Sequence, residues 1–275
     1  GTAGSGDLAR AAGGLAAELA AEPAGARLLH RALEHGGPAG VAGVARALSG
    51  RVREVAATEH GCEVLLGFIR TAGTDQAAFI ARELSAVAGA AATHAFGHAV
   101  VRLLLEYAAE DEATAAFVDA MLRGGPASLC CHKFGYRVAM SVLTSGLAMH
   151  QRVILASLCE DPNRFARHRF ASRVMACALA HPPAGEECGR LMGPIFRQPG
   201  AVVALACHSS GVHVVRAALE CPLFQKQVMQ EIRRASRKIT RDKFGRALME
   251  ELGLARPDVA VFAPGLLRRS VVAGA

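Results

Sequence analysis

Four histidines recur at nearly equal spacing along the chain, and histidine is a frequent metal ligand and general acid–base group. They are His94, His132, His168 and His208, and each stands three residues before a glycine or, once, an alanine. Copies on neighbouring packed helices would lie roughly 8–10 Å apart, too far to share one metal ion. We therefore expect these histidines to cap or brace loops, and we expect no metal and no other cofactor.

The sequence contains none of the common motifs that indicate catalysis. There is no Ser-His-Asp order, no Walker-type glycine loop, no dinucleotide fingerprint and no His-Glu-x-x-His motif. Eight cysteines are present, and none forms a Cys-x-x-Cys pair. Several lie in apolar helical patterns, where a free cysteine acts as a small apolar residue. We predict no catalytic residues, no enzyme activity and a reducing compartment, cytoplasmic, nuclear or nucleolar, with an organelle and disulfides left open.

The charge of the chain is uneven. Residues 1–120 hold 9 Lys+Arg and 14 Asp+Glu, whereas residues 121–275 hold 22 and 10, which together give the net charge of +7. Such asymmetry suggests a polyanionic partner for the C-terminal half, although an Arg-rich composition from a GC-rich genome would look similar. The cations gather in two clusters, which could be a phosphate track or solvated helix faces: Arg164, Arg167, Arg169 and Arg173; and Arg233, Arg234, Arg237, Lys238, Arg241, Lys243 and Arg246.

The histidines belong to a block, His-x-Phe-Gly-x-x-Val, that recurs about every 36 residues. It is clearest at 94–100, 132–138 and, with Ala171 replacing the glycine, 168–174. The anchor positions are Gly25, Gly61, Gly97, Gly135, Ala171, Gly211 and Gly245, spaced 36, 36, 38, 36, 40 and 34 residues apart. A fixed period of this size is typical of a repeat array rather than of a globular enzyme core.

Each repeat reads as a pair of helices. Apolar residues stand three, four and seven positions after every anchor, which is one face of an α-helix. A second helical pattern precedes the anchors, at 75–87, 112–122, 151–158 and 226–232, with room for an extra turn. So short a pair must stack on its neighbours to bury both faces, which predicts a solenoid. The phenylalanine before the anchor is expected to plug the joint between repeats.

Two segments depart from this pattern. Residues 181–200 contain Pro182, Pro183, Pro194 and Pro199, and we expect a longer loop with a distorted helix there. The tail beyond Gly253 is expected to form a degenerate cap. No apolar run reaches the roughly 18 residues of a membrane span, and residues 1–20 do not resemble a signal peptide. A targeting segment ahead of them remains open.

Helix pairs that carry His-x-Phe-Gly-x-x-Val at this period resemble the Pumilio (PUF) repeat family, from about Ala21 to Leu252. The resemblance implies a single domain over 1–275, an all-α right-handed superhelical solenoid of about seven repeats. It further implies that the concave face binds single-stranded RNA, mRNA or rRNA, with about one base per repeat. A membrane is not an expected partner, whereas other proteins of a ribonucleoprotein are.

In that family the base-contacting side chains lie one, two and five residues after the anchor. The resemblance therefore implies stacking on bases by Arg27, Arg137, Arg173 and His213. It implies base-edge contacts by His98, Arg102, Tyr136, Ser172, Arg216, Arg246 and Glu250. No repeat carries both residue types usual for edge reading, and Leu66, Met140, Ala176 and Val212 offer no polar contact. We therefore expect the stacking chemistry to be kept and most of the sequence code to be lost.

Two alternatives to RNA binding by itself stay open. One is a helical-repeat scaffold that binds protein, as armadillo and HEAT arrays do, which the acidic N-terminal half favours. The other is a structural subunit of a ribonucleoprotein. The process implied by RNA binding is translational regulation or ribosome biogenesis.

Overall fold

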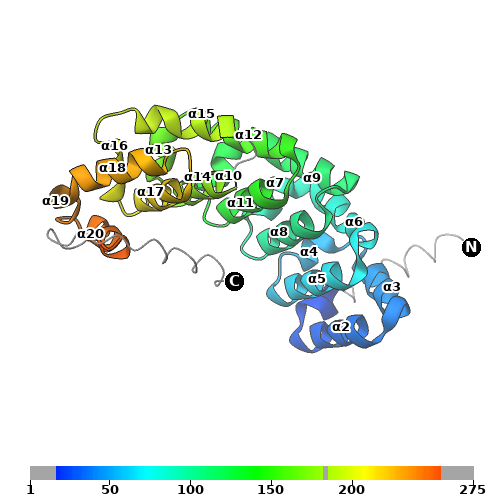
Figure 1. Ribbon diagram of the computed structural model, residues 1–275. Helices are drawn as coiled ribbons and strands as arrows, with labels where there is room; N and C mark the ends of the chain where they lie inside the picture. Colours follow the sequence, from blue (N-terminus) through cyan, green and yellow to red (C-terminus); the bar gives the residue numbers. More distant parts are fainter. Residues whose placement is uncertain (1–16, 182–184, 255–275) are drawn as a thin grey trace, which may run out of the picture.

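The computed structural model describes residues 17–181 and 185–254, and α-helices dominate them (Figure 1). Seven helices begin at or near the anchors, and we call them the anchored helices. They are α2 (Pro23–His35), α5 (Glu59–Ala72), α8 (Gly97–Ala108), α11 (Gly135–Ser145), α14 (Ala171–Ala180), α17 (Gly211–Glu220) and α20 (Lys243–Glu251).

Two further sets of helices connect them. The outer helices are α3 (Gly37–Leu48), α6 (Thr74–Leu84), α9 (Glu112–Arg123), α12 (Ala148–Cys159), α15 (Gly185–Phe196) and α18 (Gln225–Arg234). The short helices are α4 (Val52–Val55), α7 (Ala88–Thr93), α10 (Pro126–Cys131), α13 (Pro162–Arg167), α16 (Ala201–Ala206) and α19 (Ser236–Ile239). A 3-10 turn, η1 (Ser85–Val87), precedes α7.

The repeat thus contains three helices, which corrects the expected pair. The extra turn is a helix in its own right because its ends are fixed locally. At α13, the Asp161 carboxylate accepts the Arg164 N–H at 3.1 Å and Pro162 occupies the first turn, where a missing N–H costs nothing. His168 then adopts an extended backbone that ends the helix. The long outer and anchored helices were predicted correctly.

The three sets of helices form a crescent (Figure 1). Each anchored helix contacts the next one along the chain, from α2 through to α20, and this row lines the concave side. The outer helices form the convex side, and the short helices lie between the two rows at one rim. All-α solenoid architecture is therefore confirmed.

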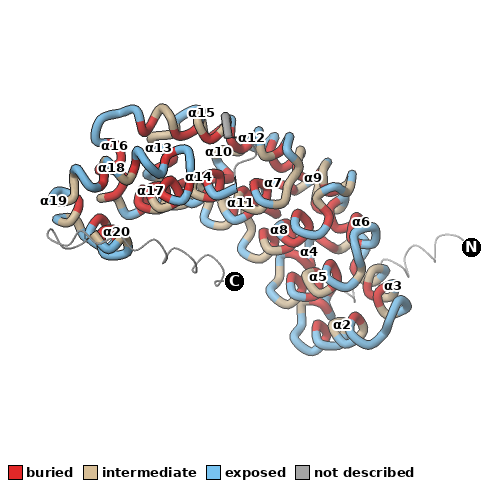
Figure 2. The backbone as a smooth tube through the Cα atoms, viewed as in Figure 1, coloured by how far each residue is buried: buried red, intermediate tan, exposed pale blue. Residues whose placement is uncertain are grey.

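The core runs the length of the crescent between these rows (Figure 2). The residue three after the anchor is fully buried in the repeats that follow another one, as at Val64, Val100 and Val138. Each such side chain contributes roughly 1.5–3 kcal/mol by leaving water. Leu28 is the counterpart in α2 and is 62% exposed, because no described anchored helix precedes α2. Stacking, not the helix itself, buries this position.

The two irregular segments have different outcomes. The distorted helix predicted within 181–200 is α15, which continues through Pro194 although proline cannot donate the usual backbone hydrogen bond. The cap predicted beyond Gly253 lies outside the described residues, apart from Leu254. Among the described helices none is by itself long and apolar enough to cross a membrane, while one sharply bent pair, 74–93 and 97–108, passes on combined length and composition.

Candidate nucleic-acid interface

The recurring histidines hold the start of the anchored helices. In each of four repeats the Nδ1 atom accepts hydrogen bonds from the backbone N–H groups two and three residues later. At His132 these bonds to Phe134 and Gly135 measure 3.2 and 3.3 Å. Asp242 makes the same pair of bonds before α20, at 2.8 and 3.1 Å. The predicted capping role is confirmed, and it requires the tautomer with no proton on Nδ1.

The anchor glycine is needed because two helices approach closely there. A Cβ atom at Gly135 would lie 2.7 Å from the Leu129 carbonyl oxygen in the preceding short helix. The same clash, with the carbonyl six residues upstream, recurs at Gly97 and Gly211 at 2.8 Å. Glycine therefore acts by its lack of a side chain and not by an unusual backbone angle. A histidine cap and an anchor glycine thus start α8, α11 and α17 in the same way. The other starts vary: α14 has Ala171 at the anchor, Asp242 caps α20, Thr58 caps α5 and α2 has no side-chain cap.

With a common start, equivalent residues occupy equivalent places on the concave side. The second residue after the anchor faces solvent, as Arg27, Arg137 and Arg173 do, or is half-buried, as His213 is. The Arg137 guanidinium lies 5.9 Å from the centroid of the Tyr136 ring, and its Nε donates to the tyrosine hydroxyl at 3.3 Å. Three arginines and one histidine thus stand in this row, where the stacking residues were predicted, and its other members are Glu63, Ala99 and Ala247.

The first residue after the anchor points instead into the joint with the next repeat. The His98 ring stacks on Phe134 with centroids 5.1 Å apart, and Tyr136 stacks on Phe170 at 5.3 Å. The Cys62 thiol donates to the Phe96 carbonyl at 3.4 Å. These contacts confirm that the phenylalanine fills the joint. The stacks themselves were not anticipated, although the regular phenylalanine spacing was a signal for them.

This placement bears on the predicted base-edge residues. His98 is 8% exposed and Ser172 is fully buried, with no hydrogen-bond partner for its hydroxyl within the described structure. Tyr136 is half-buried, whereas Arg246 is exposed. Their base-edge roles stay predictions, and those of His98 and Ser172 would require the joints to open.

In two repeats the fifth residue after the anchor tethers that repeat to the next. Arg102 Nε donates to the Ser141 hydroxyl at 3.3 Å. Arg216 forms a bidentate ion pair with Glu251, at 2.8 and 2.7 Å, which joins α17 to α20. Glu250 is exposed and free of such a pair in the described residues. Two of the predicted edge residues are therefore already engaged by the protein.

Positive charge from successive helices converges on the middle of the concave side. Burial lowers the pKa of His98, and the Arg137 and Arg102 guanidinium groups add to this effect. Burial likewise lowers the pKa of His213, with contributions from Arg173 and Arg216. Neither α11 nor α14 contains an acidic residue. This stretch of the surface is therefore suited to an anionic ligand.

A second row of cations braces the joints from the rim. The residue between the capping residue, which is His132, His168 or Asp242, and the phenylalanine is basic in three repeats, and its charge lies over the ring. Lys133 Nζ is 4.7 Å from the Phe134 centroid, Arg169 is 5.3 Å from Phe170, and Lys243 is 4.7 Å from Phe244. From the sequence, Arg169 and Lys243 were expected only as members of the two cation clusters, and no contact with a ring was expected for any of the three residues.

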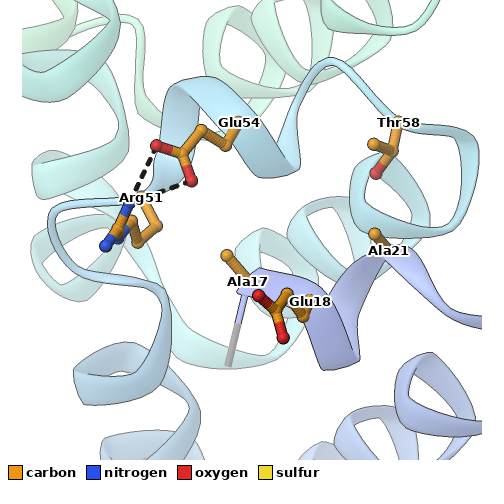
Figure 3. Close-up of a pocket in the computed structure, with 6 residues that line it drawn as sticks. All are labelled: Ala17, Glu18, Ala21, Arg51, Glu54 and Thr58. Atoms are coloured by element: carbon orange, nitrogen blue, oxygen red, sulfur yellow. Dashed lines mark hydrogen bonds and ion pairs between the residues drawn. The ribbon is translucent and has the colours of Figure 1, made fainter. Parts of the chain in front are cut away.

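The N-terminal end of the crescent differs. A hollow of about 300 Å³ near α4 is lined by Ala17, Glu18, Ala21, Arg51, Glu54 and Thr58 (Figure 3). Arg51 Nη1 is paired with Glu54 at 2.9 Å, and Glu18 adds a second carboxylate. This hollow has no net positive charge to offer an anion. Within the described residues no group of three His, Cys, Asp or Glu side chains is placed to hold a metal.

The arrangement of anchored, outer and short helices matches solved structures closely. The RNA-binding domain of Puf3, bound to the Cox17 RNA 3′ UTR recognition sequence, aligns with a TM-score of 0.76 and 17% identity, over 88% of this chain and 72% of that one. The chain has a Pumilio-repeat fold. PUF-8 in complex with PBE-RNA aligns with a TM-score of 0.75 and 15% identity, over 85% of this chain and 69% of that one.

A Puf4 mutant bound to a Cox17 RNA 3′ UTR recognition sequence aligns over 91% of this chain and 85% of its own, with a TM-score of 0.73 and 17% identity. No protein-family model and no curated protein sequence matches the chain. The PUF fold is thus evident in the arrangement of the helices, whereas sequence identity to these neighbours is 15–17%.

Proposed function

We propose that this chain binds single-stranded RNA along the concave side of its PUF repeats. The observation that carries the proposal is the row of Arg137, Arg173 and His213 on successive anchored helices, beside α11 and α14, which carry no acidic residue. Guanidinium and imidazole planes can stack on any base, and the charge of the guanidinium groups also attracts phosphates. The solved PUF neighbours, which hold RNA, support the same function.

Recognition is expected to be only weakly sequence-specific. The fifth position is Leu66, Met140 or Ala176 in three repeats, and these side chains cannot hydrogen-bond to a base edge. Two of the four polar residues at this position, Arg102 and Arg216, are held by the neighbouring repeat. Weak specificity fits a role in ribosome assembly better than selection of particular messages for translational control.

The test is selection from a randomised single-stranded RNA pool at two salt concentrations, followed by affinity measurements on variants. Stacking contributes roughly 1–3 kcal/mol per base, so Arg137→Ala with Arg173→Ala should weaken binding at least about thirtyfold. A matched control is Arg46→Ala with Arg123→Ala, which removes two exposed arginines from outer helices. Equal affinities of the two variants and the wild type would remove the concave row from the site.

One observation favours the alternative role of a protein-binding scaffold. Helix α12 exposes Met149 and Val153, at 56% and 42%, on the convex side. Salt separates the two roles, because RNA affinity should fall steeply with added salt whereas an apolar protein interface should respond little. RNA selection that enriches nothing and shows no binding at either salt would leave the scaffold as the better account.

A further inference from the structure

The C-terminal end of the crescent carries a dense group of cations that the concave row does not include. We call it the end patch. It starts on the last turn of α18, crosses the short helix α19 and reaches the first turn of α20, at the left of the crescent in Figure 1. Its members are all exposed: Arg233, Arg234, Arg237, Lys238, Arg241, Lys243 and Arg246.

The cations of the end patch have no ion-pair partner among the described residues. The contacts they make are to neutral groups: Arg246 Nε donates to the Thr240 carbonyl at 3.2 Å, and Lys243 lies over the Phe244 ring. The sole acid within 233–246 is Asp242, whose carboxylate caps α20. So many like charges in one place repel one another unless an anion binds there.

The surroundings of the patch indicate what kind of anion it suits. A protein partner normally needs an apolar or aromatic anchor at the centre of its interface. No large apolar side chain is exposed between 233 and 246; in the described residues such side chains lie elsewhere, and the one nearest in sequence is Leu223. Phe244 is half-buried beneath Lys243, so no open ring is offered for a base to stack on. Cations without anchors or rings suit a repeating phosphate.

The patch is also continuous with the concave side. Arg246 directly follows the anchor Gly245 and so stands in the first-position row of α20. From there the cations run over α19 at the rim towards α18 in the outer row. A strand on the concave side that continued past α20 would meet them next.

From these observations we infer that the end patch binds the phosphodiester backbone of the RNA where the strand leaves the concave side, without reading its bases. The inference rests on the proposed function for the identity of the polyanion. Binding at the end patch differs chemically from binding on the concave side, because it requires only phosphates and no stacking on bases.

The experiment uses a fluorescent abasic oligomer, a sugar–phosphate strand without bases, and measures its affinity for the full chain by anisotropy over a range of salt. The patch variant is Arg233→Gln, Arg234→Gln, Arg237→Gln and Lys238→Gln. The matched control removes as much charge from exposed sites on other helices, by Arg46→Gln, Arg70→Gln, Arg82→Gln and Arg123→Gln. The Arg137→Ala, Arg173→Ala variant serves as the concave control. Far-UV circular dichroism checks folding, and Arg237→Gln with Lys238→Gln alone replaces the patch variant if that one does not fold.

We expect the wild type and the matched control to bind the abasic strand with a steep salt dependence, and the concave variant to lose only the share of this binding that its two arginine charges contribute. The patch variant should lose most of this binding, and the slope of log affinity against log salt should become shallower by about 0.7 for each phosphate that the protein no longer neutralises. Equal slopes for the patch variant and the wild type, or a loss confined to the concave control, would overturn the inference. Failure of base-containing RNA to depend on Arg137 and Arg173 would instead count against the concave site.

Discussion

At the scale of single residues, the repeat depends on individual atoms at the start of each anchored helix. The imidazole Nδ1 of each recurring histidine accepts two N–H groups that would otherwise lack a partner there. The missing Cβ of the anchor glycine lets that helix pack against the carbonyl of the short helix before it. Both features act locally, but they set the direction of every side chain on the concave side.

The cap can be tested at His132. Replacing it with alanine leaves the Phe134 and Gly135 N–H groups unpaired and should lower the free energy of unfolding by about 1 kcal/mol, within the usual range for a lost cap. His132→Asp is the control, because Asp242 already performs this role at α20. Urea denaturation should show alanine below the wild type and aspartate close to it. An alanine variant as stable as the wild type would show that the cap contributes nothing.

The need for glycine at the anchor can be tested at Gly135 and compared with Ala171, the anchor position that is not a glycine. Gly135→Ala would place a Cβ 2.7 Å from the Leu129 carbonyl oxygen, so a helix must shift, at a cost of about 1–3 kcal/mol. Alanine already stands at position 171, where the helices accommodate it. Ala171→Gly should therefore cost no more than about 1 kcal/mol, mainly through backbone entropy. Thermal melts should show a larger loss of stability for Gly135→Ala than for Ala171→Gly. A larger loss for Ala171→Gly would contradict the role given to the anchor glycine.

At the scale of elements, each joint couples a helix start to a cluster of rings and cations. Histidine rings pack in these joints, and arginines lie close enough to repel a proton on them, as Arg164 does at His168. Burial is the larger cause in each case, and the guanidinium groups add to it. The pKa values of His98, His168 and His213 are therefore all lowered. The folded array holds these rings in the neutral form.

This predicts that stability falls on mild acidification. A lowered pKa means that the unfolded chain binds more protons than the folded one just below the ordinary histidine pKa of about 6.5, so unfolding is favoured there. The stabilising contribution is complete above about 6.5 and is lost as pH falls through the lowered values. Urea midpoints between pH 7.5 and 5.5 should decrease. His168→Asn keeps an acceptor for the cap but does not titrate, so this variant should show a smaller decrease of the urea midpoint. A wild-type midpoint that rose on acidification would refute the predicted acid destabilisation.

At the scale of the whole molecule, the crescent is held together only by neighbour-to-neighbour contacts. Helices in the body bury far more residues than those at the ends: α8, α14 and α17 bury seven or eight each, whereas α2 buries three and α18 two. In a repeat array such differences translate into local stability, because each repeat is supported only by its neighbours. The ends should therefore open more readily than the body.

Hydrogen exchange followed by mass spectrometry checks this expectation. Amides of α2 and α18 should exchange well before those of α8 and α14, and bound RNA should slow exchange mainly in the anchored helices. Proteolysis under native conditions should begin in the same end helices. Uniform protection along the chain would show instead that the crescent unfolds as a single unit.

Much of this organisation was predictable from the sequence. The period of the anchors required a repeat array, and the apolar spacing after each anchor required helices with one buried face, because these are local properties of the chain. The capping histidines and joint phenylalanines were also predictable as types, because each recurs at a fixed distance from its anchor. The third helix of the repeat was not, since α4 and α19 are only four residues long and leave little periodicity to detect.

The use of individual side chains was decided only by the tertiary structure. Sequence alone determined that Tyr136 and Arg137 stand side by side at the start of a helix. Packing of one repeat on the next placed Tyr136 in the joint with Phe170 and left Arg137 facing solvent. Arg216 and Glu251 are 35 residues apart and became partners only when α17 and α20 were stacked. Such outcomes depend on distances between repeats, which no periodicity within one repeat contains.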